Sequence, residues 1–295
     1  MKKILICGLC NLETSCAVRE FPVVYSPVDY NFYGVSAVPS GVGLNLALAM
    51  TALGDRVTLI SYAADDAAGR MLRDTVESRI AQPILLPCGH TPQSTVLYTP
   101  DGRRMAITDL KDMQDRSVPG EVFDRCADAD AFCLCNINYA RPLLIRAKAT
   151  GKPIFTDVHC LSDARDGYNA DFMRASDVLF LSNENIRGRE EPFVRGLAAL
   201  YPCSVIVVGM GERGALLYER AGESFTFVPA VYTRPVVNTV GAGDALFSAF
   251  VHFILSGCSA KESLRLACRF ASYKIGESGA TRGFLSEEAL LSLRA

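Results

Sequence analysis

Short apolar runs alternate with helical patterns along most of the chain. Six runs of four or five residues are almost continuously apolar, which is typical of strands covered on both faces of a sheet. They occupy residues 4–7, 57–61, 131–135, 153–157, 178–181 and 204–208. Helical patterns lie between several of them, for example at 44–53, which Gly54 ends, and at 143–150, which Gly151 ends. The alternation predicts an α/β fold with a mostly parallel sheet and right-handed crossovers.

Two segments interrupt this alternation. Residues 12–40 are rich in Val, Tyr, Phe and Pro, and residues 84–109 read as strands joined by turns, such as one at Asp101 and Gly102. Both look like β segments added to the α/β body, either as a small β lid over a cleft or as ordinary surface insertions. The chain has no long linker or internal repeat, so we expect one domain over residues 1–295.

The composition excludes several classes of protein. The chain has 295 residues, 49% of them hydrophobic, which suffices for a large buried core. Its net charge of −2 comes from interspersed acidic and basic residues, so we expect no nucleic-acid partner. No apolar run approaches the roughly 20 residues that a membrane span needs, so we expect no membrane partner. The first residues read as a buried strand rather than a secretory signal.

Cysteine is unusually frequent, with 11 residues. Most of them, including Cys7, Cys133, Cys135 and Cys268, lie in apolar contexts, which suits the reduced thiols of a cytoplasmic protein. Cys7 and Cys10 have the spacing of half a metal or redox motif, but no second pair follows. We therefore assign no metal-ligating residue from the sequence.

The most informative stretch is residues 238–249, Asn-Thr-Val-Gly-Ala-Gly-Asp-Ala-Leu-Phe-Ser-Ala. It runs from a glycine turn into an apolar helix, which places Gly241, Ala242 and Gly243 at a helix N-terminus. Backbone N–H groups there lack intrahelical partners, and the helix dipole favours an anion such as phosphate. Asp244 is then either a carboxylate that stabilises the helix dipole or a base that accepts a proton from an attacking hydroxyl.

A second glycine turn enters a helix at residues 40–45, Ser-Gly-Val-Gly-Leu-Asn. Its glycines serve either tight backbone packing or the approach of a sugar ring, with Asn45 hydrogen-bonded to that ring. Ligands of open parallel sheets bind beyond the carboxyl ends of the strands, so polar residues that follow strands are candidates for one cleft. These are Asn11, Glu13, Asp157, His159, Asn183, Glu184 and the turn 209–214.

The turn at 209–214, Gly-Met-Gly-Glu-Arg-Gly, matches the dinucleotide-binding fingerprint G-x-G-x-x-G. That fingerprint requires a helix next, whereas strand patterns at 215–219 and 225–228 follow here on either side of a turn. The sequence therefore argues against a nicotinamide-dependent oxidoreductase. It remains compatible with a glycine turn that lies near a bound nucleotide.

Together these motifs resemble the ribokinase-like, or phosphofructokinase B, family of carbohydrate kinases over nearly the whole chain. Asn-Thr-Val-Gly-Ala-Gly-Asp at 238–244 is similar to the family signature Asp-Thr-x-Gly-Ala-Gly-Asp. The turn at 40–45 resembles the family's N-terminal glycine motif, and Asn11 with Glu13 resembles its sugar-binding turn. The resemblance implies a three-layer, Rossmann-like fold with helices on both faces of the sheet and a small β lid.

The resemblance also implies an activity, which is transfer of the γ-phosphoryl group of ATP to a primary hydroxyl of a sugar or sugar derivative. Asp244 would be the catalytic base, and the amides of Gly241, Ala242 and Gly243 would form the anion hole. Acceptor contacts are implied at Asn11, Glu13, Gly41 and Asn45, and ATP contacts at Asn183, Gly211, Gly214 and Thr239. Mg²⁺ would bridge the phosphates, and the family implies a candidate K⁺ site behind the anion hole.

Several positions depart from the family pattern. Asn238, Ser40 and Glu13 stand where the family usually has Asp, Gly and Asp. Gly209, Ile186 and His159 stand where it usually has Thr, the Glu of Asn-x-x-Glu, and Asn. The last three changes affect the expected ATP and metal contacts, so a noncatalytic relative that binds a ligand without turnover is an alternative.

The acceptor is left open between a sugar, a phosphosugar and a nucleoside. Tyr30, Phe32 and Tyr33 would either stack on a nucleoside base or pack within the lid. Basic residues near the lid would suit a phosphosugar or be solvated turn charges; they are Arg19, Arg103 and Arg104. Exposed strand edges in a lid also favour a homodimer formed through it.

Overall fold

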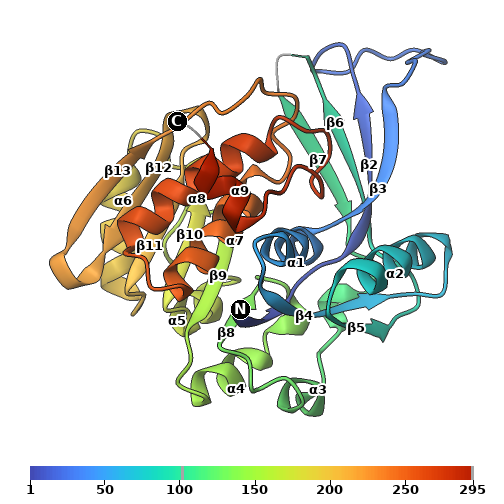
Figure 1. Ribbon diagram of the computed structural model, residues 1–295. Helices are drawn as coiled ribbons and strands as arrows, with labels where there is room; N and C mark the ends of the chain where they lie inside the picture. Colours follow the sequence, from blue (N-terminus) through green and yellow to red (C-terminus); the bar gives the residue numbers. More distant parts are fainter. Residues whose placement is uncertain (101–102, 294–295) are drawn as a thin grey trace.

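A nine-stranded sheet forms the centre of the protein, seen in a computed structural model that describes residues 1–100 and 103–293 (Figure 1). In spatial order its strands are β13 (Ser224–Pro229), β12 (Gly214–Glu219), β11 (Val205–Gly209), β10 (Val178–Ser182), β9 (Ile154–Cys160), β8 (Ala131–Leu134), β1 (Lys3–Cys7), β4 (Arg56–Ala63) and β5 (Gln82–Pro87). Pairing is parallel from β11 to β5, while β12 and β13 add an antiparallel hairpin. All six predicted strands are present in this sheet, so the expected α/β fold is confirmed.

Helices cover both faces of the sheet, which gives the expected three layers. The helices are α1 (Val42–Ala52), α2 (Ala67–Arg79), α3 (Gly120–Asp124), α4 (Leu143–Ala149), α5 (Ala170–Ala175), α6 (Glu190–Leu200), α7 (Ala242–Leu255), α8 (Ala260–Lys274) and α9 (Glu287–Ser292). Helices α1, α2, α7 and α8 share one apolar core with the sheet, and α3 to α6 lie over the opposite face. Each face of the sheet has its own apolar core, and β1 contributes to both. Ile4 and Ile6 face one core, and Leu5 and Cys7 face the other.

The helix ends follow the local sequence signals. Ser259 and Ser286 cap α8 and α9, each with its hydroxyl accepting a backbone N–H at 3.2 Å, as their positions predict. Helix α7 ends before Gly257, which has φ +93°.

A second sheet of four strands stands at one end of the main sheet, at the upper right of Figure 1. Its order is β3 (Val35–Ser40), β2 (Asn11–Ala17), β6 (Gln93–Tyr98) and β7 (Arg104–Asp109). The two predicted β segments therefore pair with each other, which favours the lid over independent insertions. Their boundaries differ from the prediction, because residues 84–87 belong to β5 of the main sheet and residues 18–34 contain no strand. The turn expected at Asp101 and Gly102 lies outside the described residues.

Candidate active site

The glycine turn before α7 has the conformation that its sequence predicts. Gly241 is the N-cap with φ +76°, and a Cβ there would meet Ala280 at 3.1 to 3.2 Å, so this position requires glycine. Ala242 donates its N–H to the carbonyl of Thr239 at 3.2 Å, which engages one of the three amides expected in the anion hole. Within the described residues, the N–H groups of Gly241 and Gly243 have no hydrogen-bond partner. Gly243 is exposed, with open space where a Cβ would be, so an anion has room beside these two amides.

Asp244, in the first turn of α7, is held by the other glycine-turn helix. Asn45 of α1 donates its Nδ2–H to Asp244 Oδ2 at 2.6 Å. Burial raises the pKa of Asp244 above its ordinary value, and the nearby carboxylate of Asp157 adds to the rise. The hydrogen bond from Asn45 and the neighbouring His159 act against the rise without cancelling it. A carboxylate with a raised pKa is a stronger base than an exposed aspartate, which suits proton abstraction.

Two of the residues expected to contact the acceptor, Asn11 and Asn45, have a buried amide oxygen without a partner among the described residues. Asn11 donates its Nδ2–H to Ser94 Oγ at 2.9 Å, and Asn45 uses its amide N–H on Asp244. Among the described residues, Asn11 Oδ1 and Asn45 Oδ1 then accept no hydrogen bond. Such acceptors are costly to bury unless a ligand supplies donors. Hydroxyl groups of a sugar are donors of that kind.

Glu13 is buried in β2 and contacts a second residue that departs from the family pattern. Its Oε2 accepts from Ser40 Oγ at 3.2 Å, and its Oε1 accepts from Ser15 Oγ at 3.4 Å. Ser40 ends β3, which pairs with β2, so the strand register brings the hydroxyl beside the carboxylate. Both side chains lie on lid strands, and β3 leads directly into the turn 40–45.

The glycines of that turn are explained by packing. Gly41 has φ +102°, and a Cβ there would meet the carbonyl oxygen of Leu9 at 2.4 Å. A Cβ on Gly43 would meet the backbone of Gly8 at 2.5 Å. The packing alternative therefore accounts for the missing side chains at both positions, and contact of the Gly41 backbone with an acceptor stays a prediction.

Three of the four residues expected near ATP, namely Asn183, Gly211 and Gly214, come together. Asn183 follows β10, and its N–H donates to the carbonyl of Gly209 at 2.9 Å. Its side chain donates to Glu190 Oε1 at 2.9 Å, and Glu190 forms an ion pair with Arg213 in the turn Gly211–Arg213. Gly211 has φ +59° and Gly214 φ +110°, and a Cβ on Gly214 would meet the carbonyl oxygen of Val228 at 2.1 Å. The hairpin β12–β13 follows this turn, so the dinucleotide fingerprint is excluded as predicted.

Glu190, which the sequence reasoning missed, joins Asn183 to the turn Gly211–Arg213. It begins α6 and is buried, and burial acts to raise its pKa, but the hydrogen bond from Asn183 and the charge of Arg213 outweigh this and lower the pKa. Ile186, at the position of the family Glu, is fully buried in the core instead. The sequence signal that could have identified Glu190 is its position, seven residues after Asn183 and at the first residue of a helix.

Thr239 is exposed, and its backbone carbonyl accepts two hydrogen bonds. Its carbonyl accepts from Ala242 and also from Nη1 of Arg104 at 3.3 Å. Arg104 begins β7, so the lid reaches the turn that precedes α7. Arg104 is one of the three arginines considered for a phosphosugar acceptor.

Asp157 and His159 at the end of β9 also face the site. Asp157 Oδ1 accepts the backbone N–H of His159 at 2.8 Å, and His159 adopts a left-handed conformation with φ +56°. The charges of both side chains act on the pKa of Asp244. They were recognised in the sequence only as polar residues after a strand.

Asn238 retains the turn function of the family Asp. Its Oδ1 accepts the N–H of Val240 at 2.7 Å, which an aspartate oxygen would also do. This substitution therefore leaves the turn intact.

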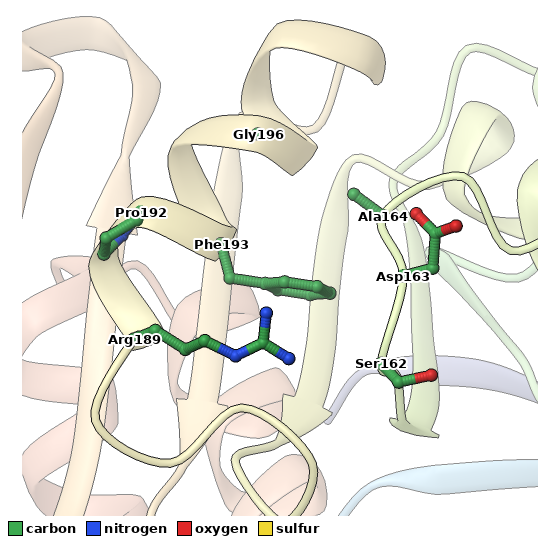
Figure 2. A pocket seen from close by; sticks show the side chains of 7 residues that line it. All are labelled: Ser162, Asp163, Ala164, Arg189, Pro192, Phe193 and Gly196. Carbon is green, nitrogen blue, oxygen red and sulfur yellow. The ribbon is translucent and has the colours of Figure 1, made fainter.

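A surface pocket lies elsewhere, between the loop after β9 and the start of α6 (Figure 2). It is lined by Ser162, Asp163, Ala164, Arg189, Pro192, Phe193 and Gly196. None of these belongs to the candidate site, so the pocket is not assigned to the reaction.

The aromatic residues considered for nucleoside stacking lie in the loop between β2 and β3. Tyr30, Phe32 and Tyr33 are exposed, and Tyr30 stacks on Phe32 with ring centroids 6.3 Å apart. They do not pack into either sheet in this conformation, so packing within the lid does not explain them.

Across residues 1–100 and 103–293, every helix falls short of the length and apolar character that a membrane span requires. The cysteines are all unpaired, and Cys7 and Cys10 are fully buried. Burial raises the pKa of the Cys10 thiol to about 12, so this thiol stays protonated.

Comparison with known proteins gives consistent results. A family profile described as pfkB family carbohydrate kinase matches residues 1–287. The chain is 24% identical to an acarbose 7(IV)-phosphotransferase of Actinoplanes sp., over 98% of this chain and 97% of that one. The fold is similar to a microbiome-derived acarbose kinase, with a TM-score of 0.88 and 24% identity over 99% and 98% of the two chains. It is also similar to Arabidopsis thaliana ribokinase complexed with ribose and ATP, with a TM-score of 0.82 and 18% identity over 99% and 98%.

Proposed function

The chain belongs to the pfkB family of carbohydrate kinases, and we propose that it phosphorylates a primary hydroxyl of a sugar or sugar derivative with Asp244 as the base. The enzyme transfers a phosphoryl group from ATP to a sugar hydroxyl, as carbohydrate kinases of this family do. The observation that carries the proposed roles is the hydrogen bond between Asn45 and Asp244. It ties α1, which carries the proposed acceptor contact Asn45, to α7, whose N-terminus offers free amides.

The acceptor end of the site suits a polyhydroxylated ligand. Asn11 Oδ1 and Asn45 Oδ1 are buried acceptors without partners among the described residues, and Glu13 adds a carboxylate. Hydroxyl groups would donate to all three side chains. The similarity to acarbose kinases over the full chain adds sugar derivatives larger than a monosaccharide to the acceptors worth testing.

Asp244 has two tasks in this account. It orients the acceptor hydroxyl by accepting its hydrogen bond, and it takes the proton as the new O–P bond forms. The N–H groups of Gly241 and Gly243 would stabilise the negative charge on the transferring phosphoryl group. Asn45 keeps the carboxylate in place, since its amide N–H is fixed on Oδ2. The lid would exclude water, which limits hydrolysis of ATP.

Magnesium fits this site as part of the bound nucleotide. Within residues 1–100 and 103–293, no group of three or more His, Cys, Asp or Glu side chains could hold a metal alone. Mg²⁺ commonly uses one or two carboxylates together with substrate phosphates and water, and Asp157 is a carboxylate available for this. When bound, the ion would neutralise charge on the phosphates. The carboxylate of Glu190 is already engaged by Asn183 and Arg213.

We also propose that the enzyme is cytoplasmic and forms a homodimer through the lid. Unpaired cysteines suit a reducing compartment. Large apolar side chains are exposed on the lid and its long loop, among them Val24, Tyr25, Tyr30, Phe32 and Ile107. A second copy of the lid would cover such a surface. Light scattering on a purified sample gives the oligomeric state.

The activity is tested by a coupled ADP-release assay with ATP and Mg²⁺ against a panel of acceptors. The panel holds pentoses, hexoses, phosphosugars, acarbose and nucleosides. Turnover with a sugar or sugar derivative supports the proposal. Turnover with nucleosides alone, or saturable ligand binding without turnover, would contradict it.

A further inference from the structure

Lys274 is a fully buried lysine directly behind the glycine turn. It is the last residue of α8, its exposed fraction is 0%, and its Nζ donates to the backbone carbonyl of Val240. A buried ammonium is costly unless charge and hydrogen bonds compensate it, so lysine is rarely retained in such a place without a task. The mechanism proposed above does not use it.

The chain just before Val240 is also tied to the end of α8. The carbonyl of Ile275 accepts the N–H groups of Val237 at 2.8 Å and Asn238 at 3.0 Å. Lys274 and Ile275 together therefore fix the backbone that leads into Gly241. The hydrogen bonds to Ile275 hold Val237 and Asn238 in place. The ammonium of Lys274 holds the carbonyl of Val240, which directly precedes Gly241.

Peptide geometry gives that contact a consequence for the anion hole. The carbonyl of Val240 and the N–H of Gly241 belong to the same peptide unit, which is planar, and in the trans form its C=O and N–H point in opposite directions. An ammonium on the carbonyl therefore sets the direction of the Gly241 N–H on the other side. Hydrogen bonding at the carbonyl also polarises the amide and strengthens its N–H as a donor.

Charged groups from three other elements surround Lys274. Asp244 of α7 and Glu13 of β2 favour its charged form, and Arg104 of β7 opposes it. Burial is the largest influence and lowers the pKa of Lys274 to about 8. The side chain is therefore mostly charged at neutral pH and loses its charge at moderately alkaline pH.

We propose that Lys274 is a positioning residue for phosphoryl transfer, whose ammonium holds the Val240 carbonyl and aims the Gly241 amide at the transferring group. It also supplies the positive charge behind the anion hole for which the family resemblance suggested K⁺. This inference rests on the proposed roles of Asp244 and the glycine-turn amides.

The test compares Lys274→Met with the wild type in kinetics and in thermal unfolding. Methionine has a similar length without charge or donor; the relief from burying a charge and the loss of the bond to the Val240 carbonyl oppose each other, so the Tm should change little. The kcat should fall about 10- to 100-fold, the range of a lost hydrogen bond to a charged group. The KM values for ATP and acceptor should change little, because the amide acts on the transferring group. Lys261→Met, at an exposed position of the same helix, is the matched control and should behave as the wild type.

The pH profile separates positioning from a purely structural role. Wild-type kcat should fall as the pH rises through about 8, where Lys274 loses its proton, and this alkaline limb should be absent in Lys274→Met. Fold stability should not fall in the same range. Because the folded-state pKa is depressed, the folded protein releases the proton before the unfolded chain does, so this group favours folding as the pH rises.

Chemical rescue provides a second variant. Lys274→Ala leaves space for a small cation, so methylammonium or propylammonium should restore part of its kcat. Wild-type turnover in a K⁺-free buffer should not change when K⁺ is added. The inference would be overturned if Lys274→Met kept the kcat of the wild type and the alkaline limb of its pH profile. Strict dependence of the wild type on K⁺ would also overturn it.

The variant Asp244→Asn distinguishes this failure from failure of the proposed site. An inactive Asp244→Asn beside a fully active Lys274→Met would refute the role of Lys274 alone. An active Asp244→Asn would refute the catalytic assignment on which the inference rests.

Discussion

Ser40 donates its hydroxyl to the Glu13 carboxylate at 3.2 Å, so two positions that depart from the family pattern are in contact. The usual glycine at position 40 has no hydroxyl to donate, and an aspartate at position 13 would be one methylene shorter. The longer glutamate and the serine therefore form one unit on adjacent lid strands. If the proposed acceptor role of Glu13 holds, both side chains of this unit should affect acceptor binding.

Glu13→Gln should raise the acceptor KM by about 10- to 100-fold, because a hydrogen bond from a ligand hydroxyl to a charged acceptor is lost. The KM for ATP should stay unchanged, since Glu13 lies at the acceptor end. Initial-rate kinetics with the best acceptor of the panel measure both. Ser40→Ala should have a smaller effect that largely disappears in the Glu13→Gln background. Glu20→Gln in the exposed lid loop is the control, and an unchanged acceptor KM in Glu13→Gln would refute the contact.

Asn45→Ala should move the acid limb of kcat to higher pH. The hydrogen bond from Asn45 lowers the pKa of Asp244, so its removal raises that pKa further. A base must be ionised to act, so activity is then lost at a higher pH as the solution is acidified. The expected displacement is about one pH unit, which corresponds to one hydrogen bond to a charged group.

The measurement is the pH dependence of kcat at saturating substrates. Asn185→Ala, at an exposed position after β10, should leave the profile unchanged. An acid limb that stays in place or moves to lower pH in Asn45→Ala would show that the bond does not tune the base.

Gly243→Ala should separate stability from activity. A Cβ at this helical position meets nothing within 4 Å, and alanine favours a helix over glycine by up to about 1 kcal/mol, so the free energy of unfolding should stay the same or rise. The added methyl group lies beside the free amides and would displace the phosphoryl group, so kcat/KM for ATP should fall about 10- to 100-fold.

Gly196→Ala in α6 is the matched control, because it is also a helical glycine with open space around its Cβ position. It should show the same stability change with wild-type kinetics. Denaturant unfolding and steady-state kinetics on the same samples measure both properties. Wild-type kcat/KM in Gly243→Ala would argue against phosphate binding at this turn.

The sequence was sufficient for the fold and for the position of the glycine turn. Apolar runs and glycine turns are local signals, and they predicted the six strands and the start of α7. The predicted extent of the lid was less accurate, because it included residues of β5. The sequence of β5 is apolar and strand-like, as in the lid, and only its pairing with β4 shows that it belongs to the main sheet.

The parts that were missed depend on contacts between distant residues. Glu190 pairs with Arg213 across 23 positions, and Lys274 reaches Val240 across 34. Nothing in the local pattern of α8 shows that its last lysine points into the protein. The internal bond of Ala242 to Thr239 likewise follows from the turn geometry and not from residue types.

The most direct test of the central claim is the kcat of Asp244→Asn at saturating ATP and acceptor, with its Tm measured on the same sample. Asparagine keeps an oxygen that can accept from Asn45 but cannot take a proton at neutral pH. The account predicts a fall in kcat of about 10²- to 10⁴-fold, the usual contribution of a general base, with a Tm equal to or above that of the wild type. Turnover within about twofold of the wild type would contradict the assignment of Asp244 as the base.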